Sequence, residues 1–589
     1  MKQFFKFMFA SMLGFFISCL VLLFIFFIII AALVSSSDKE VVIPEKSVLL
    51  ISLAEPLYER STQNPFAGLP FEGSQYMKGL GLNDVIADIR KAEKDPKIIG
   101  ILLDMSTVQS GLATVEAIRF ALTEFKKSGK FIVSYADYYT QLSYYLASVS
   151  DKIFLNPQGL LDWKGLDARL LFFKGSLEKL NIDMQIVRHG KYKSAVEPLV
   201  NDRMSAENRE QTTEFVQSFW KHMSSQVSLA RKIEVAELNR LADELTCNGA
   251  AEALANRMVD SLVYRDGLHA WLRKKLAIGE NDKINTVGLR KYIDVKPAEK
   301  KEFTKDKIAV VWASGDINTG EGSEESIGSD RISRAIRKAR TDKNVKAIVL
   351  RVNSPGGMHI ASEVIWREVQ LAVKDKPVVA SFGDYAASGG YYIACAANKI
   401  VAEPTTITGS IGVFGVIPNV QKMMNQKLGI TIDEVMTNQN SDYIPVYKPL
   451  SDFQRAVLTK DIERIYDIFL TRVAEGRKMQ RDEVDSIAQG RVWTGLTAKE
   501  LGLVDETGGL DKALALAAEL AEITNYRILS LPEQKDPFSE LVEYLSGDQQ
   551  EETAIRKALG PLYPTYRDLQ NLQHMQGIQA RLPFSFSLN

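Results

Sequence analysis

This 589-residue chain has few cysteines, few histidines and almost no net charge. Three cysteines are too few for a disulfide scaffold or a four-cysteine zinc site, and none of the five histidines forms a metal-ligand pair such as HExxH. Lys and Arg number 72 against 73 Asp and Glu, which gives a net charge of −1 and argues against nucleic acid as a partner. We therefore expect no metal centre and no nucleic-acid partner.

Disorder is also excluded, because 46% hydrophobic and 25% charged residues are typical of a globular protein. The length predicts several domains rather than one compact core.

One long apolar run stands at the N-terminus, and no later stretch is long and apolar enough to span a membrane. Phe7–Val34 is a run of 28 residues without a charge. A signal-peptide core has about 7–15 residues, whereas a spanning helix needs about 20. We expect an uncleaved anchor; the alternative is a long cleaved signal ending near Ala31-Ala32. Lys2 and Lys6 precede the run, which predicts a cytoplasmic N-terminus and a body outside the cytoplasmic membrane.

The rest of the chain repeats itself at an offset of 247 residues. Residues 132–157 align without a gap on 379–404, with nine identities in 26 positions. This sustained register predicts a duplicated domain. The expected organisation is a stub and transmembrane anchor (1–40), a first copy (41–295), a linker (296–307), a second copy (308–540) and a helical tail (541–589).

Both copies alternate short apolar runs with segments of helical periodicity, which predicts an α/β fold with a mostly parallel sheet. The expected strands are 47–53, 98–103 and 131–134 in the first copy, and 308–313, 347–352 and 378–381 in the second. Expected helices include 113–127, 362–374 and a long amphipathic helix at 205–232.

Three glycine-bearing loops distinguish the second copy: residues 353–357, 386–390 and 408–412. Glycines permit unusual backbone angles and leave amide hydrogens free for a ligand. Ser388 follows an expected strand among small residues, as an exposed nucleophile would. Such composition is also ordinary for a tight turn, but the repeat favours chemistry, since Gln141 stands at the corresponding place in the first copy.

A serine nucleophile needs a base. The first copy carries Lys191 and Lys193 within residues 190–198, whereas the corresponding stretch of the second copy, near 438–443, has no lysine. A buried lysine can act as a base because desolvation lowers its pKa, while an exposed surface position suits Lys191 better. His359 is an alternative base, although we expect its side chain to face out of a helix start. Each copy thus supplies half of a site.

Taken together, these motifs resemble bacterial signal peptide peptidase A of the long, duplicated type, a serine protease related to the Clp protease and crotonase folds. The resemblance covers nearly the whole chain, including the anchor, both copies and the segments 192–198, 353–357, 387–391 and 408–412. It implies two tandem Clp protease/crotonase-like domains behind a transmembrane helix. The implied roles are nucleophile for Ser388, general base for Lys193, orientation of the lysine for Ser410, and oxyanion-hole amides for Gly389, Gly356 and Gly357.

The implied function is a membrane-anchored endopeptidase with a Ser–Lys dyad that degrades cleaved signal peptides and other extended apolar peptides. No cofactor is implied, and the expected assembly is a homo-oligomer, with a tetramer as the expected size. Two alternatives are a crotonase-like acyl-CoA enzyme and a non-catalytic assembly scaffold. We expect the dyad to form within one chain, because a tandem joint gives the second copy a high effective concentration near the first.

Overall fold

The computed structural model describes residues 2–37, 42–61, 80–297, 303–534, 555, 558–559 and 577–581. Part of the expected linker, 298–302, and almost all of the expected tail between 541 and 576 lie outside the described residues.

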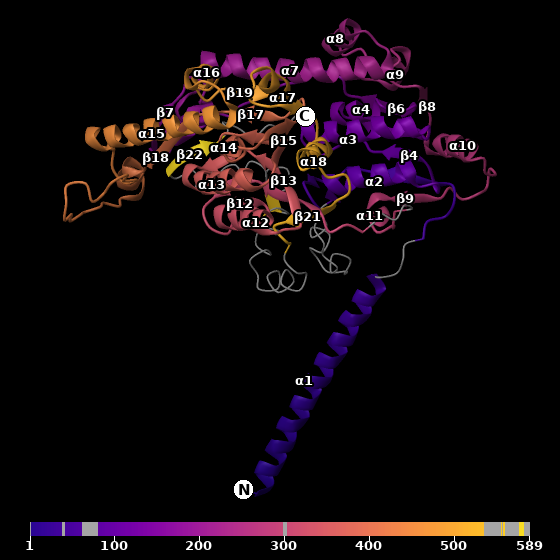
Figure 1. Ribbon diagram of the computed structural model, residues 1–589, viewed down its shortest axis with the longest axis horizontal. Helices are drawn as coiled ribbons and strands as arrows, with labels where there is room; N and C mark the ends of the chain where they lie inside the picture. Colours follow the sequence, from indigo (N-terminus) through magenta and orange to yellow (C-terminus); the bar gives the residue numbers. More distant parts are fainter. Residues whose placement is uncertain are drawn as a thin grey trace.

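The N-terminal helix α1 (Lys2–Ser37) extends away from the body of the molecule (Figure 1). Between Phe4 and Ile25 its apolar side chains are largely exposed; Phe9 is 62% and Leu20 66% exposed. Gln3–Ile25 is long and apolar enough to cross a membrane. A helix with these properties fits both the expected anchor and the alternative signal sequence.

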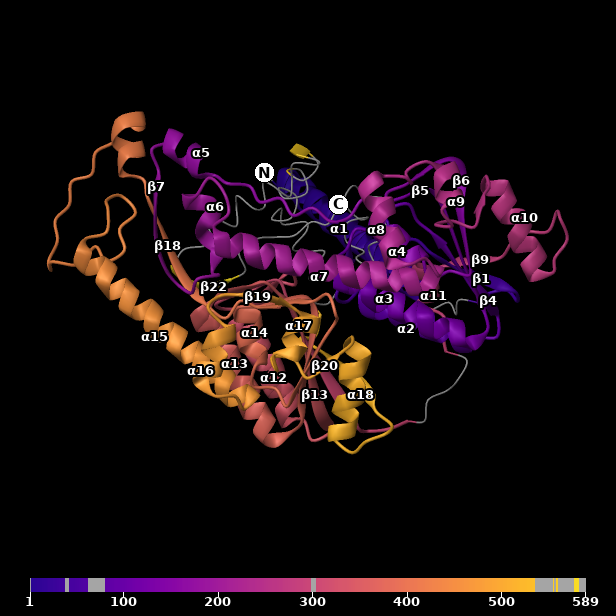
Figure 2. The ribbon, with the colours of Figure 1, turned by 90° about the horizontal axis from the view of Figure 1, so that it is seen from above.

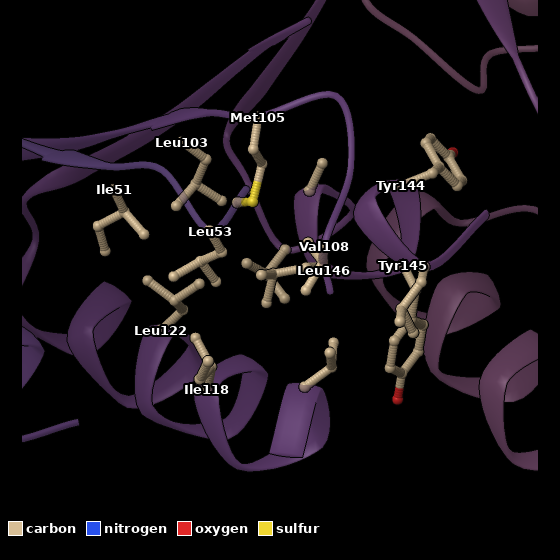
Figure 3. Close-up of a cluster of buried hydrophobic side chains, with 14 of the residues drawn as sticks. Ile51, Leu53, Leu103, Met105, Val108, Ile118, Leu122, Tyr144, Tyr145 and Leu146 are labelled. Atoms are coloured by element: carbon tan, nitrogen blue, oxygen red, sulfur yellow. The ribbon is translucent and has the colours of Figure 1, made fainter. Parts of the chain in front are cut away.

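The first copy is built on a sheet of order β8-β6-β5-β4-β1-β9, whose strands all run parallel. Its helices pack apolar side chains onto the strands, as seen where Ile51, Leu103, Ile118 and Leu146 converge (Figure 3). The strands are β1 (Ser47–Ile51), β4 (Ile98–Asp104), β5 (Phe131–Tyr139), β6 (Lys152–Leu161), β8 (Ser261–Leu262) and β9 (Thr286–Gly288). The helices at this sheet include α2 (Leu82–Lys94), α3 (Leu112–Phe125) and α4 (Gln141–Ala147).

The second copy repeats this plan with the order β19-β17-β15-β13-β10-β21, and β16 lies between β15 and β20. Its strands are β10 (Lys307–Ser314), β13 (Val345–Ser354), β15 (Val378–Ala387), β16 (Lys399–Ala402), β17 (Ile407–Gly409), β19 (Val492–Thr494), β20 (Glu506–Thr507) and β21 (Arg527–Leu531). Its helices include α12 (Ser329–Thr341), α13 (His359–Asp375), α14 (Gly389–Ala394) and α18 (Leu510–Leu520). All six expected strands and both shorter expected helices are therefore present.

A third sheet joins segments from distant parts of the chain, in the order β12-β11-β14-β22-β18-β7. Its strands are β7 (Asp183–His189), β11 (Asp316–Asn318), β12 (Ser326–Gly328), β14 (Gly356–Met358), β18 (Val413–Asn419) and β22 (Gly577–Arg581). Here β7, which precedes the lysine motif, pairs antiparallel with β18, which follows the third glycine loop. This pairing brings the two half-sites together.

Two long helices repeat one design in the two copies. Helix α7 (Ala206–Arg231) begins after the cap Ser205 and ends at Lys232 in the left-handed conformation, with φ +57°. Helix α15 (Asp452–Arg477) begins after Ser451 and ends at Lys478, with φ +56°. In Figures 1 and 2, α7 runs across both halves of the body, and its Gln211 accepts a hydrogen bond from the Val492 amide at 3.2 Å.

A buried ion pair also joins the copies. Glu59 lies in the segment that follows β2 (Leu57–Tyr58), a short strand that pairs with β3 (Leu80–Gly81). Its carboxylate accepts a 2.8 Å hydrogen bond from Arg351 Nε on β13 and another from Asn353 Nδ2. Both charged side chains are less than 10% exposed, so the pair is shielded from solvent.

Shorter helices complete the two copies: α5 (Lys174–Lys179), α6 (Glu197–Val200), α8 (Val235–Glu244), α9 (Ala250–Ala255), α10 (Arg265–Leu276), α11 (Leu289–Tyr292), α16 (Arg481–Ile487) and α17 (Gly495–Glu500).

The prediction of a helical tail is wrong at residues 577–581, which form strand β22. The reason is tertiary, because β22 pairs on one side with β14 and on the other with β18. Two flanking strands can satisfy the backbone hydrogen bonds of a short segment, whatever its intrinsic preference for helix or strand.

Candidate active site

Ser388 stands at the turn between β15 and α14. Its φ of +54° and ψ of −114° are unusual for a residue with a side chain, so the surrounding structure holds this turn in place. The Ser388 amide donates to the Gly409 carbonyl at 2.8 Å, and the Ser388 carbonyl accepts from the Tyr392 amide at 2.8 Å. The strand-to-helix turn expected from the sequence is therefore present, and it fixes the direction of the hydroxyl.

Lys193 reaches this turn from the segment that follows β7. The Tyr192 amide donates to the Gln489 carbonyl at 2.9 Å, which ties the segment to the second copy. A Cβ atom on Gly490 would lie 2.6 Å from the Lys193 Cβ, and Gly490 has φ +79°. A Cβ on Gly412 would lie 3.3 Å from the Lys193 Cδ. The lysine side chain thus passes between two positions where only glycine leaves room.

The Lys193 amine lies at the centre of three oxygen atoms. Its Nζ is 2.8 Å from Ser388 Oγ, 2.9 Å from Ser410 Oγ and 3.0 Å from the Ser410 carbonyl oxygen. A neutral amine has two N–H donors and one lone pair. Ser410 can therefore accept both N–H bonds while the Ser388 hydroxyl donates to the lone pair.

Burial makes the neutral form of this lysine favourable. Lys193 is completely buried, and desolvation holds its pKa well below the usual value for lysine. Among the described residues, no carboxylate forms an ion pair with Lys193 that would offset this effect. A neutral lysine next to a serine hydroxyl can accept the serine proton.

The glycine loops place backbone amides beside Ser388. A Cβ on Gly389 would lie 3.1 Å from the Gly357 nitrogen, so the two amides border one small space. The Gly356 amide instead donates to Ser354 Oγ at 3.2 Å. Of the three glycines named from the sequence, Gly357 and Gly389 are thus the better placed to bind an oxyanion. Gly356 has φ +106°, and it allows the turn itself.

The expectation of an exposed nucleophile is wrong in this structure, since Ser388 is 0% exposed. Strand β22 covers it: a Cβ on Gly389, the next residue, would lie 3.1 Å from the Ala580 carbonyl oxygen. The small neighbours of Ser388 do leave room above it, and the C-terminal strand fills that room.

The two alternative candidate bases lie apart from the Lys193–Ser388 pair. Lys191 is exposed, as expected, and has no hydrogen bond to Ser388. His359 does not face solvent as expected, because its half-buried ring packs edge-on against Tyr392 with centroids 5.8 Å apart. Burial lowers the pKa of His359, but no hydrogen bond joins it to Ser388 within the described part of the chain.

Several residues that shape the site escaped the sequence reasoning. Gln211 Nε2 donates to Ser194 Oγ at 2.8 Å and to the Tyr192 carbonyl at 3.0 Å, which braces the backbone on both sides of Lys193. Gly490 is a lone glycine in the sequence, and Ala580 lies almost 400 residues from the lysine, so neither gave a local signal.

Comparison with known proteins places these features in a family. The family model "Peptidase family S49" matches residues 124–279 and 370–524, one segment in each copy. "Protease 4" of Salmonella typhi is 38% identical over 500 residues, covering 82% of this chain and 80% of that protein. A "Putative signal peptide peptidase SppA" of Enterococcus faecium is 34% identical over 229 residues, covering 38% of this chain and 66% of that one.

Among solved structures, a point mutant of ClpP1 from Listeria monocytogenes is similar at 17% identity with a TM-score of 0.24, covering 35% of this chain and 94% of that chain.

The two matched segments confirm the duplication, and the peptidase relatives favour the predicted protease over the acyl-CoA enzyme and the scaffold. With the family model matching both copies and a relative matching most of its length, the chain belongs to peptidase family S49 and is a serine peptidase.

Proposed function

We propose that this serine peptidase is a membrane-anchored endopeptidase in which Ser388 is the nucleophile and Lys193 the general base. The observation that supports this most strongly is the 2.8 Å distance between Lys193 Nζ and Ser388 Oγ within one chain. Burial of the lysine adds to it, because a base must be neutral at the pH at which it works.

In the proposed reaction, Ser388 Oγ attacks the carbonyl carbon of the scissile bond while Lys193 takes the hydroxyl proton. The Gly357 and Gly389 amides stabilise the negative charge on the carbonyl oxygen. The protonated Lys193 then gives its proton to the leaving amine, and water hydrolyses the resulting ester by the same route. Ser410 keeps the amine directed at Ser388 through its hydroxyl and carbonyl oxygens.

The proposed substrates are extended apolar peptides, and cleaved signal peptides in particular. The relative from Enterococcus faecium is named for that activity. Strands β14 and β18 flank the site, and β22 between them shows that their edges accept an extended strand. A peptide that took this place would pair in the same way and leave alternate side chains to be bound by pockets.

The apolar helix α1 would hold the site close to a membrane, where such peptides are released. With Lys2 and Lys6 in the cytoplasm, the site lies on the outer face of the cytoplasmic membrane. We propose a homo-oligomer, a tetramer, whose size light scattering of the detergent-solubilised chain would measure.

The dyad is tested by comparing Lys193→Ala with Lys191→Ala, a matched change two residues away on the exposed surface. We expect Lys193→Ala to lower kcat/KM by about 10³-fold or more, and Lys191→Ala to change it little. The wild-type rate should rise with pH through an ionisation well below the free-lysine value of about 10.4, since protonated lysine is inactive. An inactive Lys191→Ala with an active Lys193→Ala would contradict the assignment.

The substrate class is tested with two peptides of equal length, one rich in Leu and Ala and one rich in Asp and Glu. We expect faster hydrolysis of the apolar peptide. A preference for the acidic peptide would contradict the proposal.

A further inference from the structure

The C-terminal strand β22 lies beside the Ser388 turn, where a peptide substrate would have to bind. It lies between β14 and β18 and runs antiparallel to both. The sheet order shows no direct pairing of β14 with β18, so β22 completes the sheet by adding one strand to two free edges. Strand addition of this kind is a recurrent mode of peptide recognition.

The register places one peptide bond of β22 at the dyad. Ala580 is paired with Gly357, whose amide is one of the two proposed oxyanion donors. The Ala580 carbonyl oxygen would lie 2.1 Å from a Cβ on Gly356 and 3.1 Å from a Cβ on Gly389. That oxygen therefore lies beside the amides that would stabilise it during attack by Ser388.

The side chains of β22 fit their surroundings on both sides of this bond. Ala580 is 1% exposed, so the site encloses a small side chain there. Ile578, two residues earlier and on the same side of the strand, packs against the core of the second copy. On the other side of the bond, Arg581 Nη2 forms a 3.1 Å ion pair with Asp316 Oδ2.

We propose that the enzyme cleaves its own chain between Ala580 and Arg581, an inference that rests on the proposed Ser–Lys dyad. Ser388 Oγ bonds to the Ala580 carbonyl carbon as its proton passes to Lys193. The bond to the Arg581 nitrogen then breaks, and Lys193 returns the proton to that nitrogen. Residues 581–589, nine in all, leave with a free amine at this step, and water then hydrolyses the ester to a carboxylate on Ala580.

The same geometry names the substrate class for added peptides. A small residue should precede the scissile bond, and an aliphatic residue should stand two positions earlier, as Ala580 and Ile578 do in β22. Larger residues at the first position would collide with a site that already encloses a methyl group.

The test is intact-mass spectrometry of the detergent-solubilised full-length chain over a time course, with hydrolysis of an added Leu/Ala-rich peptide measured on the same preparations. Wild type should lose residues 581–589, and Ser388→Ala should retain them. Ala580→Phe should slow the loss at least ten-fold, whereas Ala580→Ser, which keeps a small side chain, should not.

The outcomes separate the self-cleavage, the Ser–Lys dyad and the preference for a small residue. Wild type that hydrolyses the added peptide but keeps its full mass overturns the self-cleavage and leaves the dyad intact. Wild type that does neither contradicts the dyad itself. Loss of the nine residues from Ser388→Ala would show cleavage by another protease, and equal rates for Ala580→Phe and wild type would overturn the small-residue site.

Discussion

The two copies keep the same frame but not the same chemistry. Arg231 pairs with Asp260 at 3.1 Å in the first copy, and Arg477 pairs with Asp505 at 2.8 Å in the second. Each aspartate also accepts a backbone hydrogen bond from the strand beside it, at 2.7 and 2.8 Å respectively. These supports hold the sheet edge in place and are independent of catalysis.

The copies diverge at the start of one short helix. Ser388 precedes α14, whereas the aligned residue of the first copy, Gln141, is the first residue of α4. Gln141 Oε1 accepts hydrogen bonds from the Lys164 and Gly165 amides, both at 3.0 Å, and its Nε2 donates to the Gly165 carbonyl. The position of the proposed nucleophile in one copy is occupied in the other by a glutamine that holds a loop in place. Duplication thus allowed one copy to supply structure and a lysine, and the other a serine and its amides.

The largest expected difference is between Ser388→Ala and Gln141→Ala. The first should reduce peptidase activity by about 10³–10⁴-fold with little change in stability. The second removes three hydrogen bonds of a buried amide and should lower the melting temperature, at a cost of about 1–3 kcal/mol, while activity at a temperature below unfolding persists. Kinetics and thermal unfolding of both variants measure this; equal losses of activity would break the comparison.

A second variant tests the buried ion pair between Glu59 and Arg351, which joins the two copies. Glu59→Ala leaves the buried Arg351 guanidinium without its carboxylate, which should lower the free energy of unfolding by about 3–5 kcal/mol. The control is Glu237→Ala, which breaks the exposed pair with Arg240 and should cause no measurable shift. If both changes affected thermal unfolding equally, a structural role for the Glu59–Arg351 ion pair would be contradicted.

A smaller effect concerns how the burial of Lys193 lowers the free energy of unfolding. Lys193 has a lowered pKa in the folded chain, so between that pKa and the unfolded value of about 10.4 the unfolded state binds one more proton. Wild-type stability therefore gains about 1.4 kcal/mol per pH unit across this window from Lys193 alone. Lys193→Met should raise the melting temperature at pH 7, and the gain should shrink as the pH approaches 10.

The control for this effect is Lys191→Met, because Lys191 is exposed. A pH-independent gain for Lys193→Met, or the same curve for Lys191→Met, would contradict the buried neutral lysine.

Periodicity predicted the parallel α/β copies because each strand and helix carries its own local pattern. The repeat predicted the split of Lys193 from Ser388, since loss of a motif from one copy is visible in an alignment of the two. The closeness of Gly490 to Lys193 and the cover that β22 forms over Ser388 were not predictable. Both depend on contacts between segments far apart in the chain, and no local pattern encodes them.

The central claim is that one chain builds one site from both of its copies. Co-expression of full-length Ser388→Ala and Lys193→Ala chains, followed by a peptidase assay of the mixed assemblies, tests it most directly. If the dyad forms within each chain, as the 2.8 Å contact between Lys193 Nζ and Ser388 Oγ indicates, every site has one inactive member and activity stays absent. Clear recovery of activity would mean that an intact lysine serves the serine of a neighbouring chain, and it would contradict the account.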